Sequence, residues 1–91
     1  MIQIGVSNGE KIIIGDHAIL GPNVVFRTSD HVHDRIDVPI RDQGRTGGEI
    51  IIENDIWICA NVMVTKDVRI GAHFIIAAGS VVTSNVESYS V

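Results

Sequence analysis

A chain of 91 residues is long enough for one small domain, and its net charge of −4 without a Lys/Arg cluster argues against nucleic-acid binding. Its aliphatic residues are 16 Ile and 12 Val against a single Leu, which favours strands over packed helices. The aliphatic runs are too short for a membrane span, no signal peptide is recognisable, and the single Cys59 cannot form an internal disulfide, so we expect a cytoplasmic protein.

The first 13 residues predict one irregular partial coil with a turn over residues 7–9, and a six-residue repeat begins at Ile14. Its units, here called hexads, run over residues 14–31, stop, and resume over residues 52–87. The first position of every hexad is apolar, and the second is mostly small. The first positions are Ile14, Leu20, Phe26, Ile52, Ile58, Val64, Ile70, Ile76 and Val82.

A period of six fits neither the 3.6-residue turn of a helix nor the two-residue alternation of a hairpin. It predicts an all-β solenoid in which each hexad makes one short strand and one corner, and three hexads close a triangular coil. The first residue of each hexad then points inward and stacks on its equivalents in the neighbouring coils. The alternative is a β-sandwich, but that fold predicts turns every 8–12 residues.

The repeat is interrupted between the two runs of hexads, and we expect an inserted loop over residues 32–49 there. Three arginines, three aspartates and three glycines lie in this stretch. A long insertion on a solenoid commonly emerges on one face and is often functional. The whole chain, 1–91, is expected to form one domain.

Four histidines are candidates for chemistry. His17 and His73 occupy the fourth position of their hexads, where a polar turn residue is normal, so we interpret both as structural. His31 lies at the root of the inserted loop, and His33 follows two residues later. These two histidines with the aspartates beside them could instead bind a metal ion, but a zinc site needs three or four ligands at known spacing, so no metal site is predicted.

The stretches IGDHAILGPNVVFRTSDHVHD (14–34) and IIIENDIWICANVMVTKDVRIGAHFIIAAGSVVTSNVESYSV (50–91) resemble the hexapeptide-repeat acyltransferases. They are most similar to the galactoside, maltose, virginiamycin-type and capsular-sugar O-acetyltransferases. The resemblance implies a left-handed parallel β-helix, acetyl-CoA as acyl donor, a small hydroxyl acceptor such as a sugar, and a homotrimer with its sites between subunits. It also implies that the chain is shortened at both ends relative to the family.

The same resemblance assigns roles to individual residues. The family's catalytic histidine lies nine residues after the proline of its proline-asparagine-valine turn, and nine residues after Pro22 is His31. An imidazole there would take the proton of the attacking hydroxyl. Trp57, Ala60 and Ala78 match positions that line the acetyl-CoA groove.

Two other functions stay open from the sequence. One is a non-catalytic β-helix module that acts in self-assembly or partner binding, and the other is a metal-dependent solenoid hydrolyase. Cys59 occupies a small second position, and direct transfer needs no covalent intermediate, so we interpret this thiol as structural.

Overall fold

The computed structural model describes residues 2–5, 10–32 and 34–87, and it is built almost entirely of short strands. The first strands are β1 (Ile2–Gly5), β2 (Lys11–Ile14), β3 (Ile19–Leu20), β4 (Val25–Phe26) and β5 (Ser29–His31). A 3-10 turn, η1 (Ile40–Asp42), precedes β6 (Arg45–Gly47). The remaining strands are β7 (Glu49–Ile52), β8 (Ile56–Ile58), β9 (Met63–Val64), β10 (Val68–Ile70), β11 (Phe74–Ile76) and β12 (Val81–Val82).

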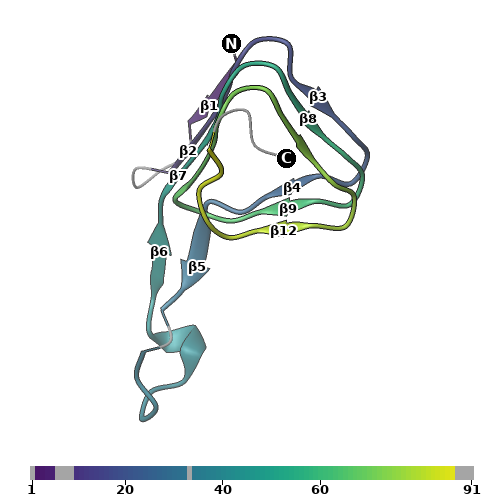
Figure 1. Cartoon of the computed structure of the whole chain (residues 1–91). Helices are drawn as coiled ribbons and strands as arrows, with labels where there is room; N and C mark the ends of the chain where they lie inside the picture. The colour runs from purple at the N-terminus through teal and green to yellow at the C-terminus, as the bar shows by residue number, and fades with distance from the viewer. Residues whose placement is uncertain (1, 6–9, 33, 88–91) are drawn as a thin grey trace.

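The strands form a three-sided prism of parallel coils that wind in a left-handed sense (Figure 1). Face A holds β2, β7 and β10, with β1 added to β2; face B holds β3, β8 and β11; face C holds β4, β9 and β12. Each strand pairs with its equivalent one coil away, so Trp57 of β8 lies between Ile19 of β3 and Ile75 of β11. The predicted triangular solenoid is confirmed, and we name its corners AB, BC and CA after the faces they join.

The core is a column of aliphatic side chains along the prism axis. As predicted, most first-position residues are buried in it, and Ile58, Val64 and Ile70 are completely buried, whereas Leu20 in the first coil is 43% exposed. Fifth-position residues such as Ile56 and Val62 share this core, because residues two apart on a strand point to the same side. Burial of each such side chain contributes about 1.5–3 kcal/mol, so the hexads themselves supply the stabilising free energy.

Each corner turns at the fourth position of a hexad. Residues with positive φ occupy this position at all three corners, among them His17 (61°), Asn23 (59°), Asp55 (60°), Asp67 (60°) and His73 (58°). Asn, Asp and His are the side chains enriched in this left-handed conformation. Both histidines at such positions, His17 and His73, lie at the AB corner.

Two segments depart from the expected coil path. Residues 2–5 run antiparallel to β2 as a hairpin rather than as a partial coil, and the predicted turn at residues 7–9 lies outside the described residues. The second departure is an arm, residues 28–48, that leaves the CA corner (Figure 1). Its strands β5 and β6 pair antiparallel, so the chain leaves the prism at residue 29, before the predicted start of the loop at residue 32. The hexad assigned to residues 26–31 therefore forms no corner, because its second half pairs with the returning strand.

None of the helical segments in the described part of the chain has the length and apolar character needed to cross a membrane.

Candidate functional site

His31 lies at the end of β5, on the exposed surface of the arm. Its partner across the hairpin is Arg45, and the next amide, of Val32, donates to the carbonyl of Gly44 (3.0 Å). The root of the arm is tied to the prism by the Thr28 hydroxyl, which donates to Glu10 Oε1 (2.9 Å). A two-stranded hairpin therefore carries the exposed imidazole outside the three sheets of the prism.

The residues considered as helpers of His31 are placed differently. Asp30 precedes it on the same strand, so the two side chains point to opposite sides of the hairpin. Asp30 Oδ1 lies 3.5 Å from Arg27 Nη2 instead. His33 lies outside the described residues.

The tip of the arm is held by its own polar contacts. The side-chain nitrogen Nε2 of Gln43 donates to the backbone carbonyls of Arg35 (2.8 Å) and Val38 (2.7 Å). The Arg35 guanidinium donates to Asp37 and lowers the pKa of that carboxyl below its ordinary value. Ile36 is fully exposed beside this cluster, so the tip has apolar surface that this chain leaves uncovered.

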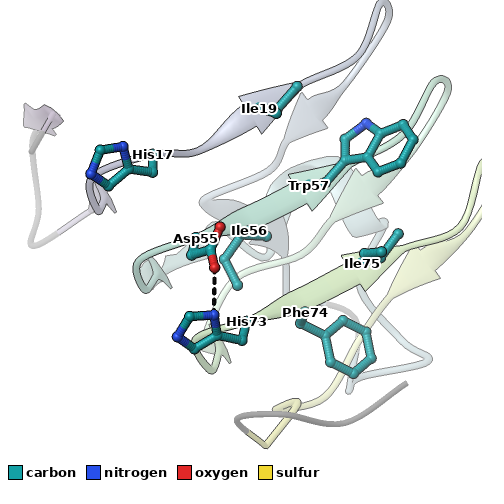
Figure 2. Close-up of a pocket in the computed structure, with 8 residues that line it drawn as sticks. All are labelled: His17, Ile19, Asp55, Ile56, Trp57, His73, Phe74 and Ile75. Carbon is teal, nitrogen blue, oxygen red and sulfur yellow. Dashed lines mark ion pairs between the residues drawn. The ribbon is translucent and has the colours of Figure 1, made fainter.

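A pocket of about 390 Å³ lies on face B, next to the AB corner (Figure 2). One end is lined by polar corner residues: His17, Asp55 and His73. The other end is lined by the apolar residues Ile19, Ile56, Trp57, Phe74 and Ile75. A concave site with a largely apolar wall and a few convergent polar groups is typical of small-molecule binding.

The polar end is organised by the stacking of the coils. The amide of Asp55 donates to the carbonyl of Asp16 (2.9 Å), and the amide of His73 donates to the carbonyl of Asn54 (3.2 Å). The same stacking brings His73 Nδ1 into contact with Asp55 Oδ2 (Figure 2). His17 is turned away from this pair.

Sequence reasoning did not single out Asp55, and it treated His73 as an isolated corner residue. The signal was available, because the two residues are 18 positions apart, which is one complete coil of three hexads. Residues with this spacing stack on neighbouring strands, about 4.8 Å apart. A charged residue and a histidine at equivalent corner positions therefore meet.

The residues predicted to bind acetyl-CoA lie on face B and at the adjoining BC corner. Trp57 points outward from the middle of face B and is 48% exposed. Ala60 and Ala78 lie one above the other at the BC corner, where the carbonyl of Ala60 accepts a hydrogen bond from the amide of Gly79 (3.0 Å). Cys59 is half-buried beside them, and its amide donates to the carbonyl of Ile76 (3.0 Å).

His31 does not meet Trp57 within one chain. The arm that carries His31 leaves the CA corner, and face B is the side of the triangle opposite that corner (Figure 1). A reaction that needs both residues therefore requires a second copy of the chain.

Among the residues that the structure describes, no group of three or more His, Cys, Asp or Glu side chains is placed to hold a metal ion.

Comparison with known proteins gives consistent relatives, although no protein-family model matches the chain. The galactoside O-acetyltransferase of Lactococcus lactis is 36% identical over 76 residues, which are 82% of this chain and 35% of that protein. The galactoside O-acetyltransferase of Escherichia coli is 32% identical over 80 residues, covering 82% of this chain and 36% of that protein. The chain thus spans about a third of the length of these relatives.

Solved structures agree with the sequence relatives. A hexapeptide-repeat acetyltransferase from Vibrio cholerae, in complex with acetyl-CoA, is 38% identical with a TM-score of 0.75, covering 85% of this chain and 41% of that one. The polySia-specific acetyltransferase NeuO is 26% identical with a TM-score of 0.62, covering 85% of this chain and 45% of that one.

Proposed function

Since this chain is related in sequence and in fold to the hexapeptide-repeat acetyltransferases, we propose that it is the catalytic β-helix of an acetyl-CoA-dependent O-acetyltransferase. The acceptor is a hydroxyl of a sugar or a similar small molecule. The observation that carries this proposal is the combination of an exposed histidine on a projecting arm with an outward-facing tryptophan on a prism that matches a neighbour solved with acetyl-CoA.

The reaction assigns one task to His31. Its imidazole accepts the proton of the acceptor hydroxyl as that oxygen attacks the carbonyl carbon of the thioester. A carbon–oxygen bond forms, the carbon–sulfur bond breaks, and the proton passes to the departing thiolate of CoA.

The proposed binding site for acetyl-CoA consists of Trp57, Ala60 and Ala78. The small side chains at the BC corner leave room for the extended pantetheine arm to approach the backbone. The indole of Trp57, on the neighbouring face, is then the wall beside the thioester. An exposed tryptophan at this position supports a binding role, because burial in a core would serve packing alone.

The separation of His31 from Trp57 supports a site between subunits of a homotrimer. Outward-facing aliphatic side chains continue over two faces, with Ile19 and Ile75 on face B and Val25 and Val81 on face C, all between 45% and 62% exposed. Contiguous apolar surface of this kind marks interaction sites. A neighbouring subunit would cover the stripe on face C and bring its arm beside the stripe on face B, which stays open as a site between the two subunits.

The cytoplasmic location expected from the sequence remains a prediction.

The test is a thioester-cleavage assay with acetyl-CoA and a panel of hydroxyl and amine acceptors, on protein of known oligomeric state. We expect turnover with at least one hydroxyl acceptor, and a decrease of about 10²- to 10⁴-fold for His31→Ala. Unchanged thermal unfolding of that variant is the control, because His31 is exposed. Unchanged turnover in His31→Ala would show that another group is the base.

A non-catalytic module that acts in self-assembly or partner binding is the second candidate, and the exposed aliphatic side chains on faces B and C favour it. Isothermal titration with acetyl-CoA separates the two functions. Binding together with turnover supports the enzyme, whereas no detectable binding supports the module.

A further inference from the structure

The pocket on face B has polar chemistry that the proposed acetyl transfer does not use. Of the residues that line it, Asp55 is the only one with a carboxylate, and none is a lysine or arginine. Asp55 therefore supplies the one side chain of this lining that carries a negative charge. Such a lining disfavours an anionic guest and favours a cation.

The apolar end of the pocket also suits a cation of a particular kind. Trp57 offers an indole, the aromatic side chain that attracts cations most strongly over its face. Ile19 and Ile75 flank it on the neighbouring strands and provide contact surface for methyl or methylene groups. A bare metal ion would gain nothing from contact with this apolar surface, whereas the methyl or methylene groups of a substituted ammonium ion would pack against it.

The two ends belong to one pocket. Asp55 is the turn residue directly before β8, Trp57 is the middle residue of β8, and both line the cavity. A cation is attracted to an aromatic ring when it lies within about 6 Å of the ring centre. A trimethylammonium group in this pocket therefore has a carboxylate and an indole in its lining.

We propose that this pocket binds a small organic ammonium ion, with the Asp55 carboxylate as its counter-ion and the Trp57 indole as its wall. His73 is a positioning residue, because its Nδ1 contacts Asp55 Oδ2 and holds the carboxylate at the pocket rim. If the proposed function holds, the ammonium group belongs to the acetyl acceptor. Trp57 would then lie between the acceptor and acetyl-CoA. The binding itself does not depend on that function.

The test uses the intrinsic fluorescence of the assembled protein, in which Trp57 is the only tryptophan. Choline is titrated in parallel with 3,3-dimethylbutan-1-ol, its uncharged isostere, without acetyl-CoA. We expect saturable change of the Trp57 emission by choline, at an affinity at least about threefold higher than for the isostere. Equal affinities, or no change with either compound, would overturn the proposal.

Two matched variants locate the effect. Asp55→Asn removes the charge and keeps a residue that this turn position accepts, as Asn23 and Asn61 show at the BC corner. In this variant the ratio of the affinities for choline and for its uncharged isostere should fall to about one. Asp67→Asn removes the same charge from the equivalent turn position at the CA corner, outside the pocket, and should leave the preference intact. An equal loss in both variants would mean general charge attraction and would refute the assignment of Asp55.

Because the readout is binding without acetyl-CoA, its failure is distinguishable from failure of the proposed function. Choline binding to a protein without transferase activity would uphold the pocket and refute the enzyme. Transferase activity without selective choline binding would uphold the enzyme and refute the pocket.

Discussion

The prism and the arm are stabilised in different ways although they are parts of one short chain. In the prism, every coil repeats the same inward aliphatic column, and residues such as Ile58 are completely buried. In the arm, Ile36 and Ile40 are exposed, and order comes from hairpin bonds and from the side chain of Gln43. The prism therefore provides the stability of the molecule. The arm carries a group for chemistry and contributes little to that stability.

The largest loss of stability is expected from a cavity in the prism. Ile58→Ala should lower the free energy of unfolding by about 2–5 kcal/mol, because the side chain is completely buried. The matched change Ile36→Ala on the arm should stay within about 0.5 kcal/mol. Chemical denaturation at a fixed protein concentration measures both, and similar losses would contradict the division of roles.

A smaller effect is expected from two glycines. A Cβ on Gly21 would lie 2.8 Å from the backbone nitrogen of Ala60, so Gly21→Ala should push two coils apart and cost about 1–3 kcal/mol. Gly44 has a φ of +90° and open space around it, so Gly44→Ala should strain only the arm, by about 1 kcal/mol. Thermal unfolding should therefore shift more for Gly21→Ala. A larger shift for Gly44→Ala would show that the arm contributes to global stability.

A still smaller change in global stability is expected from Gln43→Ala, which removes the bonds to Arg35 and Val38. Because the contacts are local and largely exposed, the free energy of unfolding should fall by less than about 1 kcal/mol. Hydrogen exchange should nevertheless accelerate at the amide of Arg35, which donates to Gln43 Oε1 (3.2 Å). Unchanged exchange there would mean that Gln43 does not order the tip.

The smallest effect concerns acid. The pKa of Asp37 is lowered by Arg35, so their ion pair is formed above the ordinary pKa of an aspartate and is lost as the pH falls through the lowered value. Arm amides should then exchange faster relative to prism amides, and Asp37→Asn should show that faster exchange already at neutral pH. Equal exchange in the variant and the wild type would show that this ion pair has no ordering role.

The prism could be predicted from the sequence because its rule is periodic. Every sixth residue is apolar, and equivalent side chains occupy the same place in the core of successive coils. The path of the arm could not be predicted, because its hairpin depends on single contacts such as Thr28 with Glu10 rather than on a repeat. The hexad assigned to residues 26–31 failed at this boundary.

The candidate site was predictable only in part. His31 and Trp57 were singled out from a resemblance, and the structure places them on opposite sides of one chain. Asp55 was missed, because a turn aspartate is ordinary until its neighbour one coil away is considered. Distances between chains are set by assembly, which no period within the sequence encodes.

The central claim is that His31 of one subunit acts beside Trp57 of another, and subunit mixing tests it most directly. His31→Ala and Trp57→Ala are purified separately, shown to have little turnover, then unfolded, mixed in equal amounts and refolded. If each site in a closed homo-oligomer takes one residue from each of two neighbours, random mixing restores about a quarter of the wild-type turnover. No recovery from the mixture, with each variant still assembling and binding acetyl-CoA, would contradict the account.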